Sequence, residues 1–133
     1  MTEPVWVPVS AGELVDKITI LQIKRERMTD AQQLANVRRE LALLEETAAK
    51  LDTAAMRAQL DALQAQLLAV NSTLWDLENK VRAFARAQDH GADFVAAAQS
   101  IYDNNDRRAA IKRQINQLLG SAIVEEKDHS GGR

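Results

Sequence analysis

The sequence predicts an all-α, elongated four-helix protein with a long central helix and an antiparallel coiled-coil hairpin. The first observation behind this prediction is an unbroken alternation of four- and three-residue spacings, carried by Met56, Leu60, Leu63, Leu67, Val70, Leu74, Leu77, Val81 and Phe84. Such a heptad pattern puts one apolar stripe on a single helix, which would be roughly 55 Å long at 1.5 Å per residue. The second observation is the composition, because 46% hydrophobic but only 4% aromatic residues favour helices over sheets.

Length and charge limit the class of protein. The 133 residues fit a single domain over 1–133, and the net charge of −2 gives no general attraction to nucleic acid or to an acidic membrane. The lack of cysteine excludes disulfides and thiolate metal sites. Neither a signal peptide nor a membrane-spanning stretch is recognisable, so we expect a cytoplasmic protein.

The chain is expected to begin with an extended arm over 1–10, because β-branched and aromatic residues surround Pro8, which cannot donate to a strand ladder. Ser10 and Glu13 then form a capping box that starts a helix over 11–28. The apolar stripe of this helix contains one polar position, Arg25.

A second helix is predicted over 31–51, capped by Thr29 or Asp30, and the long helix over 53–89. The apolar spacing changes to five between Leu51 and Met56, which indicates a reversal into an antiparallel hairpin. We expect 31–51 to pair with the first half of the long helix, while the second half bundles with 11–28 and the last helix. The bare apolar surface of such a hairpin predicts a homodimer.

The last helix is predicted over 94–119, with Asp93 as its cap and Gly120 as its end. Residues 121–127 are expected to form an extended strip and 128–133 a disordered tail.

Most catalytic motifs are absent. The two histidines fall in a turn and in the tail, without metal-ligand spacing, and no glycine-rich phosphate loop or nucleophile elbow is present. We therefore expect no metal and no cofactor.

Polar residues that interrupt or flank the apolar stripes are the informative feature. If 11–28, the second half of 53–89 and 94–119 pack together, their polar stripes converge in a partly buried pocket. The candidate ligand-binding residues are Glu13, Lys17, Lys24, Asn71, Trp75, Glu78, Arg82, Tyr102, Asn105, Arg108 and Lys112. One interpretation is a structural network of ion pairs, and the other is a site in which surplus cations bind a small anion.

Four blocks resemble a bacterial family of small helical proteins of unknown function: GELVDKITIL at 12–21, VNSTLW at 70–75, YDNNDRRA-IK at 102–112 and GSAIVEEK at 120–127. The resemblance covers nearly the whole chain except 31–51 and the ends. It implies that the polar residues of these blocks, Asp16 and Glu125 among them, belong to the family pattern, which favours a real site as much as a structural network.

Two functional hypotheses follow. In the first, the protein is a binding or assembly module that uses the hairpin for self-association and the pocket or the strip 121–127 for a protein partner. In the alternative, it is an enzyme for a small anionic substrate bearing a phosphate or carboxylate. Arg108, Lys112, Lys17 and Lys24 would then hold the anion, and Glu78 or Glu13 would transfer the proton.

Overall fold

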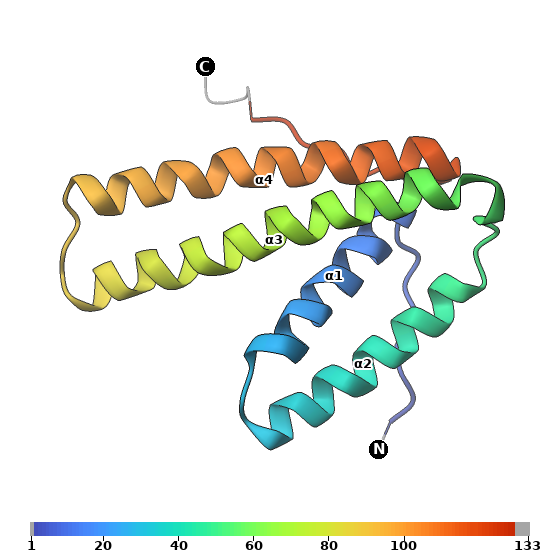
Figure 1. The fold of residues 1–133 in the computed structure, drawn as a ribbon, viewed down its shortest axis with the longest axis horizontal. Coiled ribbons are helices and arrows are strands. Elements are labelled where there is room, and N and C mark those ends of the chain that lie inside the picture. Colours follow the sequence, from blue (N-terminus) through green and yellow to red (C-terminus); the bar gives the residue numbers. More distant parts are fainter. Residues whose placement is uncertain (1, 130–133) are drawn as a thin grey trace.

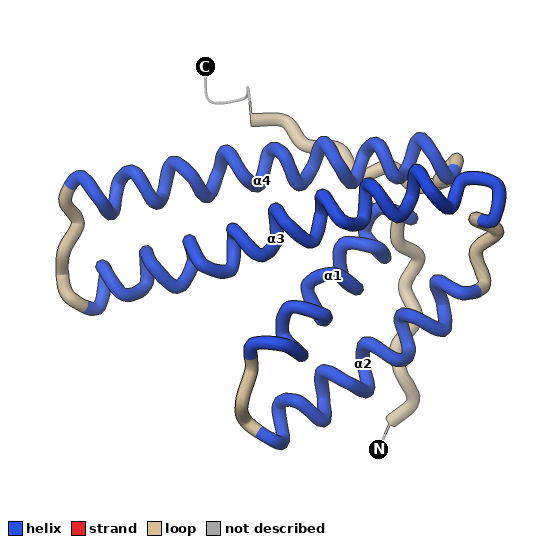
Figure 2. Tube along the Cα trace, viewed as in Figure 1, coloured by secondary structure: helices blue, strands red, loops and turns tan. Residues whose placement is uncertain are grey.

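A computed structural model describes residues 2–129 and contains four α-helices (Figures 1 and 2). They are α1 (Ala11–Arg27), α2 (Ala31–Ala49), α3 (Arg57–Arg86) and α4 (Ala92–Leu119), with a short 3-10 helix, η1 (Ala54–Met56), before α3. Within these described residues no strand is formed. The prediction of an all-α protein with four helices and a long third helix is therefore confirmed.

Helix α1 contacts each of the other three helices. It packs against α2 on one side and against both α3 and α4 on the other. Helices α3 and α4 run antiparallel as a long hairpin, and the end of this hairpin near residues 86–92 extends beyond α1 and α2 (Figure 1). The chain after α4 turns back along that helix (Figure 1).

Helix α1 can serve both sides because it carries two apolar faces. Leu14, Ile18 and Leu21 pack with Val37 and Leu41 of α2 in one core cluster. Val15 points elsewhere and packs with residues of α3 and α4 in a second cluster, which contains Leu60, Leu67, Ile111 and Ile115. The sequence pattern had identified only the first of these faces.

The N-termini of α1 and α2 follow the expected chemistry, whereas the long helix predicted over 53–89 begins as α3 at Arg57, with an N-cap, Met56, that makes no side-chain hydrogen bond. The Ser10 hydroxyl accepts from the Glu13 amide at 3.1 Å, and the Asp30 carboxylate accepts from the Gln33 amide at 2.9 Å. Helix α4 ends at Gly120, whose φ of +60° suits glycine. The predicted cap of α4 was wrong, since α4 begins at Ala92 and Asp93 lies in its first turn.

The partner predicted for residues 31–51 was also wrong. Helix α2 packs on α1 and not along the first half of α3. The physical reason is that Leu14, Ile18 and Leu21 offer α2 an apolar face directly after a short turn, while Leu60 and Leu67 are covered by α1 and α4. The antiparallel hairpin that protrudes from the protein is formed by α3 and α4 instead.

Two other sequence expectations concern exposed positions. Arg25, placed toward the core by its spacing, is exposed to solvent, because desolvating an unpaired guanidinium is costly; Met28 packs against the α1–α2 cluster instead. Residues 121–129 have no regular secondary structure, and the part of the predicted tail at 130–133 lies outside the described residues.

Across the described chain, every helix is too short or too polar to cross a membrane.

The close approach of α1 to α4 depends on the absence of a side chain at Gly12. A Cβ there would lie 2.4 Å from the Lys112 carbonyl oxygen. We predict that Gly12→Ala destabilises the protein by about 1–3 kcal/mol, because α1 and α4 must move apart. Urea unfolding followed by circular dichroism measures this. Gly91→Ala is the matched control, since its Cβ meets only the Asp89 side chain at 3.2 Å, and equal losses in both variants would contradict the prediction.

Candidate functional site

The centre of the candidate site is Asp16, a carboxylate on α1 that is fully buried. The Arg108 guanidinium of α4 donates through Nε to both carboxylate oxygens, at 2.9 and 3.1 Å, and through Nη2 to Oδ2. This forked arrangement matches the planar geometries of the two groups. The hydrogen bond to Asp16 raises the pKa of Arg108, and this effect exceeds the opposing effect of burial.

Asn71 brings α3 into the same network. Its side-chain amide nitrogen donates to Asp16 Oδ1 and to Thr19 Oγ1, both at 2.9 Å. The Thr19 hydroxyl in turn donates to the backbone carbonyl of Asp16 at 2.7 Å. Asp16, Thr19 and Asn71 are all buried, and Arg108 is partly exposed, so the network connects three helices and is closed to water on the side of Asp16 and Thr19. We call Asp16, Thr19, Asn71 and Arg108 the buried network.

A second cluster lies nearer the start of α1. Lys112 Nζ donates to Glu13 Oε2 at 2.6 Å and to Glu125 Oε2 at 3.3 Å, and only 10% of its side chain is exposed. Lys17 lies 3.9 Å from the other oxygen of Glu13. Burial lowers the pKa of Lys112, but the hydrogen bond to Glu13 and the charges of Glu13 and Asp16 outweigh that effect, so the pKa is raised overall.

The first turn of α1 is completed by residues from the other end of the chain. The Gly12 amide donates to Asn116 Oδ1 at 2.6 Å, and the Ala11 amide donates to Ser121 Oγ at 3.1 Å. Ser121 Oγ donates onward to the Ile123 carbonyl at 2.6 Å. The unpaired amides at a helix start are thus satisfied by α4 and the segment after it.

An open cleft of about 370 Å³ lies beside the buried network, between α1, α3 and α4. Its walls combine apolar, amide and charged side chains, namely Ile20, Ile23, Asn71, Leu74, Trp75, Glu78, Asn79, Arg82, Asn105 and Arg108. Arg82 and Glu78 form an ion pair at 3.8 Å near its mouth. Asn71 and Arg108 belong to both the cleft and the buried network, so the network forms one wall of the cleft.

The structure divides the predicted site residues into groups. Six of them line the cleft together: Asn71, Trp75, Glu78, Arg82, Asn105 and Arg108. Glu13, Lys17 and Lys112 lie in the second cluster. Lys24 is half-buried on α1 outside the cleft, and Tyr102 is 58% exposed beside a separate hollow. A ligand-binding role for these residues stays a prediction.

Four residues that determine the charge balance and the geometry of the site are not among the predicted ligand-binding residues: Asp16, Thr19, Asn116 and Glu125. A signal for two of them was present, since Gly12, Asp16, Thr19 and Ile23 follow one another at helical spacing and mark a second face of α1. Asp16 and Glu125 also belong to the sequence blocks that resemble the family. The sequence alone does not indicate that Asp16 pairs with Arg108 or that Glu125 pairs with Lys112.

Among residues 2–129 no group of three or more His, Cys, Asp or Glu side chains is placed to hold a metal ion.

The fold and the site define a small all-α protein in which a buried polar network of three helices forms the wall of an open cleft. The chain belongs to a family of unknown function, DUF6165, whose family model matches residues 5–132. No curated protein and no solved structure matches the chain.

We predict that Asp16→Asn destabilises the protein by about 1.5–3 kcal/mol, because the partly buried Arg108 then loses its counter-ion and the charged hydrogen bonds to it. Equilibrium urea unfolding measures the loss. Asp76→Asn is the matched control, because Asp76 pairs with Arg27 at an exposed position and its loss should cost at most about 1 kcal/mol.

The double variant Asp16→Leu with Arg108→Met removes both charges, and it should recover part of the stability that Asp16→Asn loses. If Asp16→Asn is as stable as the wild type, the buried network does not hold the three helices together.

A pH dependence follows from Lys112. Its pKa in the folded state is raised above the ordinary value of 10.5, so the stability from this group is present below that pH and is lost as the pH rises through the folded-state pKa. We predict that the free energy of unfolding decreases above pH 10.5 more steeply in the wild type than in Lys112→Met. Thermal unfolding across the alkaline range measures both slopes, and parallel slopes would contradict the assignment.

Proposed function

We propose that this protein is a cytoplasmic binding module whose cleft between α1, α3 and α4 accepts a short, uncharged segment of polypeptide. The observation that carries the proposal is the lining of the cleft, where asparagine amides and Trp75 surround an apolar floor. The cleft volume of about 370 Å³ lies within the usual range for ligand sites, roughly 300–1,000 Å³.

The charges of the site argue for an uncharged ligand. Arg108 is neutralised by Asp16, Lys112 by Glu13 and Glu125, and Arg82 by Glu78. An added anion would meet no surplus of positive charge and would have to give up its water shell, which is costly in a partly enclosed site.

The amide groups supply the recognition. Asn79 and Asn105 each offer a donor and an acceptor, the pair of groups that a peptide unit requires. The hydrogen bonds of Asn71 to Asp16 and Thr19 use its amino group, so its carbonyl Oδ1 is the atom that it would offer to a ligand. Trp75 adds a flat apolar surface against which an aliphatic side chain or a peptide plane can pack.

The alternative is an enzyme that acts on a small anionic substrate. One observation supports it: the bonds of Arg108 to Asp16 use Nε and Nη2, so Nη1 of this cleft residue is not part of the ion pair. The pairing of Arg108, Lys112 and Lys17 with carboxylates counts against it, because these are three of the four residues expected to hold the anion; the fourth, Lys24, lies outside the cleft.

Fluorescence of Trp75 in a Trp6→Phe background tests the proposal. We expect a pool of N-acetylated, C-amidated tetrapeptides of uncharged residues to shift the Trp75 emission and to raise the melting temperature. Asn79→Leu, at an exposed position in the cleft, should weaken this binding at least about tenfold, because a buried peptide group would lose its hydrogen-bond partner.

Asn36→Leu, at an exposed position on α2, is the matched control and should bind like the parent. Inorganic phosphate and citrate serve as anionic probes. If they shift Trp75 and the peptides do not, the enzyme alternative replaces the proposal; if neither class shifts it, the cleft is not a binding site for this ligand chemistry.

A further inference from the structure

The N-terminal arm, residues 2–9, is the most unusual surface of the molecule. It has no regular secondary structure and exposes consecutive large apolar side chains, with Val5 at 90%, Trp6 at 73% and Val7 at 69% exposed. Single exposed apolar residues are common on proteins, but a contiguous run with a tryptophan marks an interaction site.

The end of the α3–α4 hairpin that extends beyond α1 and α2 carries an apolar groove, which could accept apolar side chains such as those of the arm. It has a volume of about 310 Å³ and is lined by Val81, Arg82, Ala85, Phe94, Ala98 and Ile101. This part of the hairpin extends beyond α1 and α2, so no third helix covers it (Figure 1). The heptad stripe of α3 therefore continues past the core, and its last members, Val81 and Phe84, stay only half-buried.

We propose that the N-terminal arm of one copy docks in the groove of a second copy, and that two copies exchange arms to form a homodimer. The occupant of the groove is thus a defined segment of this chain.

The chemistry of the two surfaces matches. The groove is apolar apart from Arg82, which is exposed and lies 3.8 Å from Glu78, and the arm is apolar apart from Thr2 and one anion, Glu3. Pro4 and Pro8 restrict the arm to extended conformations, which lowers the entropy cost of ordering it on a partner.

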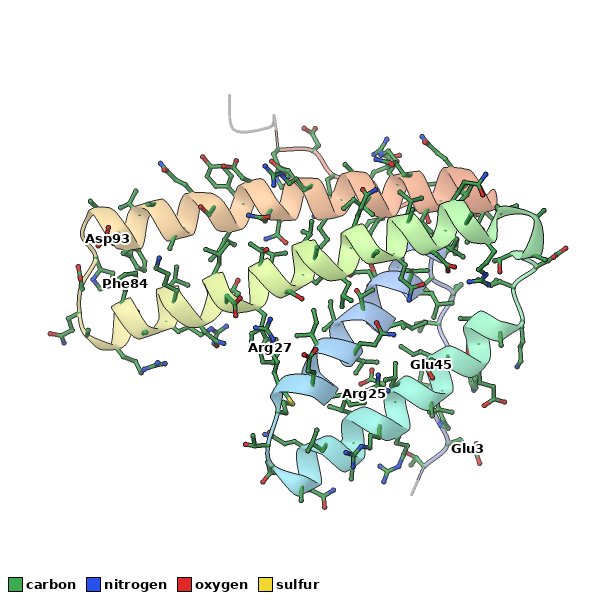
Figure 3. All side chains as sticks on the ribbon, viewed as in Figure 1. Glu3, Arg25, Arg27, Glu45, Phe84 and Asp93 are labelled. Atoms are coloured by element: carbon green, nitrogen blue, oxygen red, sulfur yellow. The ribbon has the colours of Figure 1, made fainter. Side chains whose placement is uncertain are left out.

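The arm does not lie in the groove of its own chain. Trp6 is four residues from Ser10, a reach of at most ~14 Å from the start of α1. Gly12 contacts Lys112, and the groove residues Ile101 and Phe94 are 11 and 18 residues before Lys112, roughly 16 and 27 Å away along α4. In Figure 3, Glu3 lies at the opposite end of the molecule from Phe84 and Asp93. The groove is therefore open to the arm of a second copy.

Exchange of arms doubles the contact, because each copy supplies one arm and one groove. A tryptophan side chain can bury roughly 150–250 Å² on its own, so the two Trp6 side chains would supply a substantial part of the about 1,200–2,000 Å² that a standard interface buries.

Sedimentation velocity of the full chain over a range of micromolar concentrations tests the proposal. We expect a monomer–dimer equilibrium whose dissociation constant increases at least about tenfold in Trp6→Ala and in Ala98→Arg, which fills the groove. Leu43→Ala, an exposed apolar position on α2, is the control and should leave the equilibrium unchanged. Arg82→Glu should weaken the dimer, and adding Glu3→Arg should restore it.

Cross-linking identifies the contact directly, because the natural chain has no cysteine. Copies carrying Val5→Cys, mixed with copies carrying Ala98→Cys, should form a mixed disulfide much faster than with copies carrying Gln99→Cys, an exposed neighbour outside the groove. A monomer at every concentration would overturn the proposal. So would a dimer that Trp6→Ala and Ala98→Arg leave intact, or equal cross-linking rates at positions 98 and 99.

Discussion

The fold depends on one buried charge. A carboxylate as deeply buried as Asp16 is costly unless every oxygen lone pair has a partner, and its partners come from different helices: Arg108 from α4 and Asn71 from α3. Apolar packing would tolerate small shifts of one helix along another, whereas the forked contact of Arg108 with Asp16 does not. The network therefore fixes the register of three helices at once. The cleft has a defined shape because two of its wall residues belong to that network.

The two faces of α1 stabilise the fold in different ways. The buried contact with α2 is made by apolar side chains, which stabilise the pair of helices without fixing their register. The face toward α3 and α4 mixes Val15 with the buried Asp16 and Thr19, and it allows the backbones to approach closely at Gly12. Exposed ion pairs such as Arg82–Glu78 add little stability, so the buried pair and the Lys112 cluster account for most of the electrostatic contribution.

The sequence predicted the helices well because apolar spacing, capping residues and glycines act locally. It did not predict the partner of α2, because either pairing buries the same apolar stripe, and only the second face of α1 decides between them. The convergence of Asn71, Trp75, Asn105 and Arg108 was predictable from polar residues beside the stripes. The charge balance was not predictable, because Asp16 pairs with Arg108, 92 residues away along the chain, and Glu125 pairs with Lys112, 13 residues away. Neither pairing follows from a local pattern.

The contacts of α1 also have a consequence for synthesis of the chain. Helix α1 is made well before its polar partners Arg108, Lys112, Asn116 and Ser121. At roughly 5–20 residues per second, Arg108 follows Asp16 by about 5–20 s. Through that interval the α1–α2 hairpin can form, with Asp16 still hydrated on its outer side. The nascent chain therefore exposes the second face of α1 until α4 and the segment after it have been made.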